Sequence, residues 1–289
     1  MRTFLPVLIS VILSVVVSYA LLKPQQPAAT VTAEVKAQSV YDRVTKSKTL
    51  RCGWTSFPPL QFKDSNTGEM KGLYVEMTEQ LARDHDWKVI WTEEVAATDA
   101  VAALNANRVD MMCGPYVPVA QRTQWSYFSI PHFFAPFRAY VRIDDTRFDA
   151  SRATMNSPDT RISILEGEIT SILARTLFPK AKVTELSAAQ GMTMALQNVV
   201  TKKADIIFSD PFTFGMFDQS NPGTLRQVKG EDIGFFSANY MIKMGEDDFK
   251  WVIDSGLHEL LNRGYIEKLA NDYHLLEAGI YLPADGFKK

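Results

Sequence analysis

Residues 49–82 read TLRCGWTSFPPLQFKDSNTGEMKGLYVEMTEQLA, and this stretch decides the fold class. A short strand is predicted over 49–54, ending before a pair of prolines. The segment DSNTG at 64–68 is a polar turn, and residues 73–83 place apolar side chains on one face of a helix. A strand followed by a helix of this length begins an α/β unit.

The same alternation of strand and helix continues along the chain. A second strand is expected at 88–91, a helix at 99–107 and a third strand at 109–113. After residue 149 the pattern restarts, with strands at 161–165, 182–186 and 204–208, helices at 170–177 and 191–201, and closing helices at 249–263 and 265–273. Repeats of this kind imply parallel strands, with ligands bound beyond their carboxyl ends.

Composition excludes several classes of protein. The 289 residues contain 31 Lys and Arg against 33 Asp and Glu, a net charge of −2, which argues against a nucleic-acid partner. Two cysteines cannot build a zinc ribbon, and the four histidines show no HExxH spacing. We therefore expect no metal and no other cofactor.

The N-terminal segment predicts export of the chain. Residues 3–22, TFLPVLISVILSVVVSYALL, carry no charge and are long enough to span a bilayer. Residues 1–22 are therefore either a cleaved signal peptide or a retained membrane anchor. Residues 23–39, rich in Pro, Gln and Ala, are expected to be a flexible linker. The rest of the chain is periplasmic or otherwise extracytoplasmic in both cases, and tethered to the inner membrane in the second.

Three further stretches join residues 49–82 in resembling a known family. They are LNANRVDMMCGPYVPVAQRTQWSYFSIPHF at 104–133, KKADIIFSDP at 202–211 and NRGYIEKLANDY at 262–273. In this order, from about residue 40 to 275, the chain resembles the family-3 extracytoplasmic solute-binding proteins, the amino-acid-binding components of ABC importers.

The resemblance implies the two-lobed, type II periplasmic-binding-protein fold of the α/β class. Lobe 1 would comprise residues 40–138 and 240–289, and lobe 2 residues 139–239. Each lobe would contain a mixed, mainly parallel sheet flanked by helices, and two hinge strands would cross between the lobes. The implied function is capture of a small polar, amino-acid-like ligand in the cleft by a monomer, without catalysis, and delivery to an ABC permease.

Two charged residues carry the implied binding chemistry. An amino acid is a zwitterion, so its site must offer a cation and an anion. Arg122 matches the family's arginine, whose planar guanidinium binds the ligand carboxylate. Asp210 matches the aspartate that binds the ammonium. The alternatives are a surface arginine in a rim ion pair and an Asp-Pro turn.

Phe57 matches the family's aromatic residue before the proline, and Trp54 lies just upstream. Both would cover the ligand, although aromatic residues after a strand often belong to the core.

Other positions depart from the family pattern. Hydroxyl donors of the family are missing or displaced here. Either backbone N–H groups, such as those near Gly114, and the hydroxyl of Thr170 replace them, or the ligand is not a standard α-amino acid. Glu168 either adds a second anion to the cleft, favouring a cationic ligand, or faces solvent at a helix start.

Cys52 and Cys113 fall at matching depths of two strands that the implied sheet order makes neighbours. Facing Cβ atoms of adjacent strands lie slightly too far apart for the usual bridge. The exported setting permits a disulfide, and two buried free thiols are the alternative.

Two other functions fit the same scaffold. The first is an enzyme resembling the cyclohexadienyl dehydratases, with Glu168 as its acid. The second is a tethered sensor whose closure another membrane protein reads.

Overall fold

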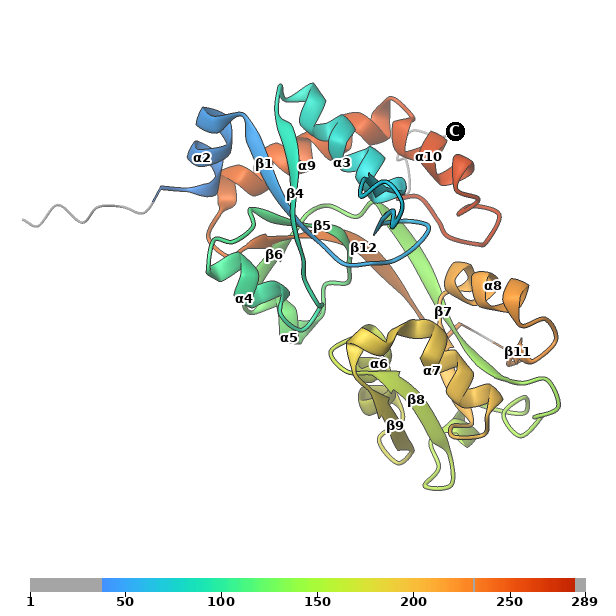
Figure 1. Cartoon of the computed structure of the whole chain (residues 1–289). Coiled ribbons are helices and arrows are strands. Elements are labelled where there is room, and N and C mark those ends of the chain that lie inside the picture. The colour runs from blue at the N-terminus through green and yellow to red at the C-terminus, as the bar shows by residue number, and fades with distance from the viewer. Residues whose placement is uncertain (1–37, 231, 284–289) are drawn as a thin grey trace, which may run out of the picture. The chain divides into compact units, whose positions relative to one another are not determined.

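The computed structural model describes residues 38–230 and 232–283, and the described residues from Ser39 onward belong to one compact unit. Two lobes make up this unit, and each is built around its own part of a mixed sheet (Figure 1). The strand order is β4-β1-β5-β12-β7-β10-β8-β9, with β7 and β12 in the middle. The two-lobed α/β fold expected from the sequence is confirmed, while the proposed lobe boundaries at 138/139 and 239/240 remain a prediction.

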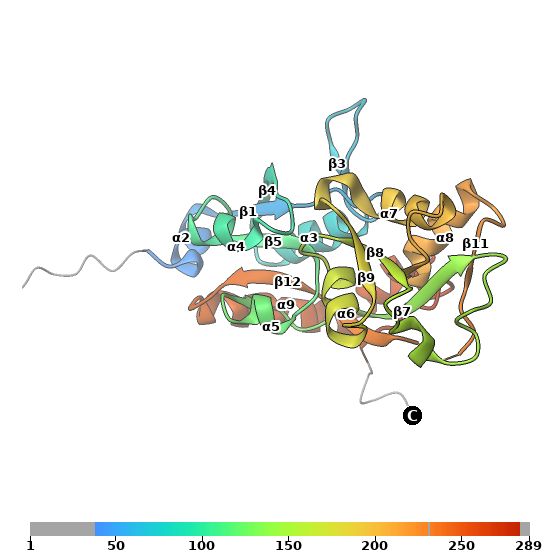
Figure 2. The same ribbon diagram turned by 90° about the horizontal axis from the view of Figure 1, so that it is seen from below.

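Lobe 1 contains the parallel strands β4, β1 and β5 and the helices packed on them. Its strands are β1 (Thr49–Trp54), β2 (Phe62–Lys63), β3 (Met70–Lys71), β4 (Lys88–Glu94), β5 (Met111–Tyr116) and β6 (Ser126–Phe128). Its helices are α2 (Val40–Ser47), α3 (Leu73–Asp84), α4 (Ala100–Asn105), α5 (Ala120–Thr123), α9 (Asp247–Asn262) and α10 (Tyr265–Asp272). The β2–β3 hairpin projects from this lobe (Figure 2).

Lobe 2 contains the parallel strands β10, β8 and β9, with α6 on one face and α7 and α8 contributing to the other. Its strands are β8 (Arg161–Leu165), β9 (Lys182–Leu186), β10 (Ile206–Ser209) and β11 (Leu225–Gln227). Its helices are α6 (Ile169–Leu177), α7 (Gly191–Val200) and α8 (Pro211–Ser220), with short 3₁₀ turns at Arg152–Met155 and Ala188–Gln190.

The lobes are joined by two long strands, β7 (Phe133–Arg142) and β12 (Gly234–Lys243). Residues Phe133–Phe137 pair antiparallel with Gly234–Ala238 between the lobes. Beyond this pairing the strands separate, because β7 continues beside β10 in lobe 2 and β12 beside β5 in lobe 1. This arrangement provides the two crossings that the sequence implied.

Several boundaries differ from the sequence-based expectation. Strand β4 extends to Glu94, three residues beyond the expected end at residue 91. This edge strand exposes alternate side chains to solvent, so the polar residues at its end were not recognised as part of a strand. Helix α8 was not expected, since its residues have little amphipathic pattern. Its start is nevertheless encoded, because Asp210 caps the helix and Pro211 occupies its first position.

The predictions for residues 1–22 and for most of the linker lie outside the described residues. Among residues 38–230 and 232–283, no helix has the length and apolar character that crossing a membrane requires.

A buried aspartate fixes the amino end of the sheet in each lobe. Asp110 accepts hydrogen bonds from the backbone N–H of Arg51 at 2.7 Å and from its guanidinium at 2.8 Å. In lobe 2, Asp205 accepts the same two bonds from Arg161, at 3.0 and 3.1 Å. Each buried carboxylate is thus neutralised by an arginine of the neighbouring strand, as burial of a charge requires.

His132 is a fully buried polar residue in the core of lobe 1. Its ring lies 4.3 Å from that of Tyr240, and its Nε2 lies 3.3 Å from Ser129 Oγ. Nδ1 has no hydrogen-bond partner among the described residues. Burial lowers the pKa of His132 from 6.5 to about 3, so the folded protein holds this imidazole neutral.

His132 should make stability depend on pH. Below about pH 6.5 the unfolded chain binds a proton at this residue that the folded protein does not bind. The free energy of unfolding should therefore fall by about 1.4 kcal/mol for each pH unit from 6.5 toward 3. Denaturant unfolding at about pH 7 and about pH 4.5 should show a smaller loss for His132→Phe than for the wild type. The exposed control His258→Phe should behave like the wild type, and an equal loss in His132→Phe would contradict the assignment.

Cys52 and Cys113 form a disulfide between β1 and β5, with an Sγ–Sγ distance of 1.99 Å and a Cα–Cα distance of 5.5 Å. Both residues are fully buried in lobe 1. The bridge closes a loop with a sequence separation of 61 residues, so it restricts the unfolded chain considerably.

Removing the bridge should destabilise the protein by about 2–4 kcal/mol. The double variant Cys52→Ser/Cys113→Ser and the reduced wild type should both unfold at lower temperature than the oxidised wild type. Mass spectrometry of the denatured protein should show a gain of about 2 Da on reduction, as expected for one bridge. An unchanged mass would show that the thiols are free.

Candidate functional site

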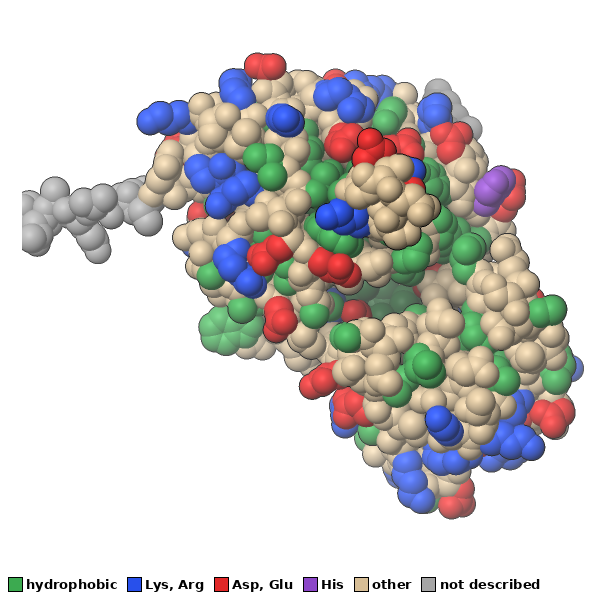
Figure 3. Space-filling model, in the orientation of Figure 1, with side chains coloured by type: hydrophobic (Ala, Val, Ile, Leu, Met, Phe, Trp, Pro, Cys, Tyr) green, Lys and Arg blue, Asp and Glu red, His purple; other side chains and the backbone are tan. Residues whose placement is uncertain are grey.

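A cavity of about 270 Å³ lies between the lobes, next to the crossing strands. The hollow is visible between the two lobes in Figure 3. Lobe 1 and its C-terminal segment contribute Thr55, Ser56, Phe57, Leu60, Tyr74, Ala97, Pro115, Tyr116, Val117, Arg122, Leu275 and Ile280. Lobe 2 contributes Leu165, Glu168, Ile169, Ala188, Gly191, Met192, Asp210, Phe212 and Thr213, and the crossing strands Phe133, Ala135, Phe137, Phe236, Ser237 and Ala238. The cavity is small and mostly apolar, with a few polar groups, as ligand sites usually are.

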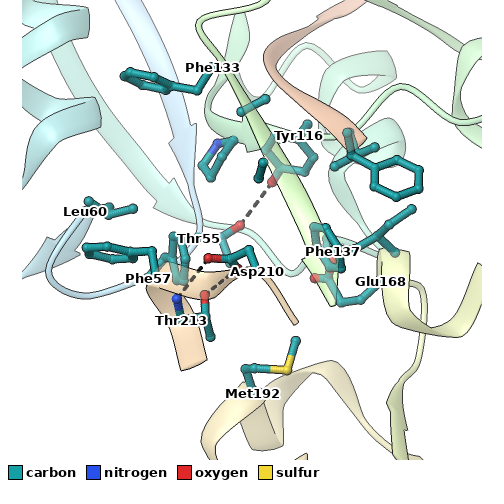
Figure 4. Close-up of a pocket in the computed structure, with 18 of the residues that line it drawn as sticks. Thr55, Phe57, Leu60, Tyr116, Phe133, Phe137, Glu168, Met192, Asp210 and Thr213 are labelled. Atoms are coloured by element: carbon teal, nitrogen blue, oxygen red, sulfur yellow. Dashed lines mark hydrogen bonds between the residues drawn. The ribbon is translucent and has the colours of Figure 1, made fainter. Parts of the chain in front are cut away.

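Asp210 follows strand β10 and lies at the wall of this cavity (Figure 4). Its carboxylate accepts hydrogen bonds from the backbone N–H of Thr213 at 2.9 Å and from the Thr213 hydroxyl at 2.6 Å. Burial raises the pKa of Asp210, whereas these hydrogen bonds from Thr213 act in the opposite direction. Asp210 is thus both a helix cap and a cavity residue, and its oxygens retain lone pairs for a ligand.

Arg122 comes from the short helix α5 and reaches across to lobe 2. Its guanidinium donates to the carbonyl oxygen of Gly167 at 2.6 Å and, more weakly, to that of Val117 at 3.4 Å. The guanidinium carbon also lies 5.9 Å from the ring centre of Tyr116. Backbone carbonyls and an aromatic ring therefore hold the side chain of Arg122 at the cavity.

Glu168 is the third charged residue of the cavity. Its Oε2 lies 3.9 Å from the guanidinium of Arg122, and its side chain is about two-thirds buried, with 31% exposed. Burial raises the pKa of Glu168, and the positive charge of Arg122 partly offsets this effect. Glu168 thus lines the cavity, and it is also the residue at the start of α6, as its alternative assignment expected.

Tyr116 extends the polar part of the cavity wall. Its hydroxyl lies 3.0 Å from Thr55 Oγ1 (Figure 4). The Thr55 hydroxyl donates to the carbonyl oxygen of Val95 at 2.8 Å. Burial raises the pKa of Tyr116 to about 12, so the phenol stays neutral. Since the Thr55 hydroxyl gives its only proton to Val95, the Tyr116 hydroxyl donates to Thr55 Oγ1, and the Tyr116 oxygen can still accept a hydrogen bond from a ligand.

Four of the residues expected in the site share one cavity: Arg122, Asp210, Phe57 and Glu168. Three others do not line it. Trp54 lies with Trp91 at a separate depression of lobe 1, and the hydroxyl of Thr170 turns back to accept a bond from the N–H of Leu165 at 3.2 Å.

Gly114 is the third residue placed elsewhere. A Cβ at this position would lie 2.8 Å from Gln61 Oε1, so Gly114 permits the close approach of a buried glutamine. The buried Gln61 side chain in turn donates to the carbonyl oxygen of Cys113 at 2.6 Å.

The sequence reasoning missed most of the aromatic wall. Phe133 and Phe137 on β7 and Phe236 on β12 line the cavity, and Tyr74 and Tyr116 add two more rings. The aromatic run in HFFAPF could have indicated the first two, but their position at the cleft depends on how β7 pairs with β12.

The lobes touch each other at Gly167, which has a positive φ of 71°. A Cβ at this position would lie 2.6 Å from Cγ2 of Thr98, which precedes helix α4 of lobe 1. Together with the bond from Arg122 to the Gly167 carbonyl, this contact holds the lobes close in the structure.

Gly167→Ala should shift the protein toward a more open form, because the added methyl group meets Thr98. Small-angle scattering should show a larger radius of gyration than for the wild type. The double variant Gly167→Ala/Thr98→Ala removes the clash but keeps the backbone strain of about 1–3 kcal/mol, and should recover the wild-type radius. An unchanged radius in the single variant would contradict a closing role for this contact.

The fold and the cavity between the lobes define a two-lobed solute-binding protein. The family model "Bacterial extracellular solute-binding proteins, family 3" matches residues 50–275. The chain therefore belongs to this family. A search of curated proteins gave no significant match.

Solved structures support the same fold. An ancestral amino-acid-binding protein, described as a precursor of cyclohexadienyl dehydratase, has a TM-score of 0.70 and 22% identity, covering 82% of this chain and 99% of that one. A cysteine-binding protein from Campylobacter jejuni has a TM-score of 0.68 and 17% identity, and the match covers 87% of this chain and 97% of that one. An amino acid ABC transporter substrate-binding protein from Streptococcus pneumoniae, bound to L-arginine, has a TM-score of 0.68 and 16% identity. The match covers 85% of this chain and 100% of that one.

Proposed function

We propose that this protein is an extracytoplasmic receptor that captures a small amino-acid-like ligand between its lobes and delivers it to an ABC permease. The observation that carries the proposal is that Arg122 and Asp210, from different lobes, line one small cavity. A guanidinium and a carboxylate are the two groups that an amino-acid zwitterion needs.

The local bonding of both residues leaves room for a ligand. A guanidinium has five N–H donors, and the carbonyls of Val117 and Gly167 occupy two of the donor groups of Arg122. The carboxylate of Asp210 is bonded to Thr213, a neutral donor. Closure around a ligand would remove water and so strengthen the attraction between these groups and the ligand charges.

The comparisons support the ligand class and the partner. The similar structures are named for amino acids, and one is named as part of an amino acid ABC transporter. We assign the same class of ligand and a permease partner to this chain, with the protein acting as a monomer. The apolar segment 3–22 would keep it near that permease if it is retained.

Binding without catalysis fits the cavity better than a dehydratase. A dehydratase needs a protonated acid aimed at a leaving group. Glu168 is buried enough to have a raised pKa, but the guanidinium of Arg122 at 3.9 Å favours its charged form. We therefore assign Glu168 to ligand selection.

A thermal-shift screen of amino acids, amines and small carboxylates tests the proposal. A ligand at one hundred times its Kd should stabilise the folded protein by about 2.7 kcal/mol. No response to any amino acid or amine would contradict the proposed receptor.

Arg122→Ala and Asp210→Asn should each weaken binding of the identified ligand about 10- to 100-fold, because each removes a charge-assisted hydrogen bond of about 1.5–3 kcal/mol. Asparagine also caps helices, so Asp210→Asn should leave α8 intact. The control is Asp218→Asn on the same helix, which does not line the cavity and should bind normally. Wild-type affinity of both site variants in calorimetric titration would remove the assignment.

A further inference from the structure

The charges of the cavity do not balance. Within the described part of the chain, its charged lining residues are one arginine, Arg122, and two acids, Glu168 and Asp210. Since most other lining residues are apolar or aromatic, a closed cavity that holds a ligand of net charge zero would keep one excess negative charge in surroundings of low polarity.

Glu168 and Arg122 already neutralise each other. Their charged groups lie 3.9 Å apart, and Arg122 is also bonded to the carbonyl of Gly167, the residue next to Glu168. The side chain of Arg122 is nearly buried, with 11% exposed, so water screens this pair only in part. Glu168 therefore stands beside Arg122 where a ligand carboxylate would be expected to act.

Asp210 has no such partner. Among the described residues no lysine, arginine or histidine forms an ion pair with it, and its hydrogen bonds come from neutral donors. The rings of Phe57, Tyr74 and Phe212 line the same cavity. A half-buried carboxylate beside apolar rings has lost part of its hydration, so a cation that reaches it is favoured, and aromatic faces also attract cations.

We infer that the cleft selects a ligand of net charge +1, and that Glu168 sets this preference by neutralising Arg122. The inference rests on the proposed function. The ligand ammonium lies against Asp210. If the ligand also has a carboxylate, a second cationic group of the ligand balances that negative charge. Two kinds of molecule share this chemistry: an amino acid with a cationic side chain, and a monoamine without a carboxylate.

Calorimetric titration with three probes tests this inference. L-lysine and n-pentylamine have net charge +1, whereas L-norleucine lacks only the side-chain ammonium of lysine and has net charge zero. The wild type should bind at least one cation about tenfold or more tightly than norleucine. Tight binding of lysine alone identifies the amino-acid class, and tight binding of pentylamine identifies the amine class.

Glu168→Gln should reduce the preference for the cation over norleucine about tenfold, because the cavity then has no excess charge. The control Glu166→Gln removes an exposed glutamate two residues away and should keep the wild-type preference. The double variant Arg122→Gln/Glu168→Gln leaves Asp210 as the single charge of the wall. It should restore the affinity for pentylamine relative to Glu168→Gln alone.

The outcomes separate this inference from the proposed function. Equal binding of norleucine and the cations by the wild type, or an unchanged preference in Glu168→Gln, overturns the inference and leaves the receptor function in place. Failure of the wild type to bind any of the three probes overturns the inference. If the wider amino-acid and amine screen is also negative, the proposed function fails as well.

Discussion

The antiparallel pairing of Phe133–Phe137 with Gly234–Ala238 is the constraint on which the rest of the structure depends. It joins the two parts of the mixed sheet through backbone hydrogen bonds, while each strand continues into a different lobe. Because side chains alternate along a strand, the same pairing aims Phe137 and Phe236 into the space between the lobes. The hinge and the aromatic wall are therefore one structural feature.

Two fully or nearly fully buried aspartates and the half-buried Asp210 differ in their hydrogen-bond partners. Asp110 and Asp205 lie at the amino ends of strands, and arginines of neighbouring strands neutralise them. Asp210 lies at the carboxyl end of β10 and has only neutral donors. Ligands of α/β sheets bind beyond the carboxyl ends of the strands, and the ammonium of the proposed ligand would give Asp210 the cationic partner that the described residues do not provide.

Much of the site could be predicted from residue types in motifs. Arg122, Asp210, Phe57 and Glu168 were expected in the site, and they line one cavity. Trp54, Gly114 and Thr170 were placed wrongly because nearness in sequence to a cleft residue does not fix where a side chain points. Thr170 bonds to the backbone of Leu165, and Gly114 makes room for Gln61. Tyr116 and the rings of the crossing strands were missed, since their place depends on contacts between distant segments.

The sequence by itself determined the alternation of strands and helices, the α/β class and the order of the family's motifs, because periodicity and turn residues act locally. The Asp-Pro pair at 210–211 suggested only a turn, and the structure shows that Asp210 caps α8 with Pro211 at its first position. Only the tertiary structure decided that Arg122 faces Glu168 across the lobes while Asp210 stays without a cation. Charge balance in a cleft is a property of groups brought together through space, and no local pattern along the chain encodes the distances between them.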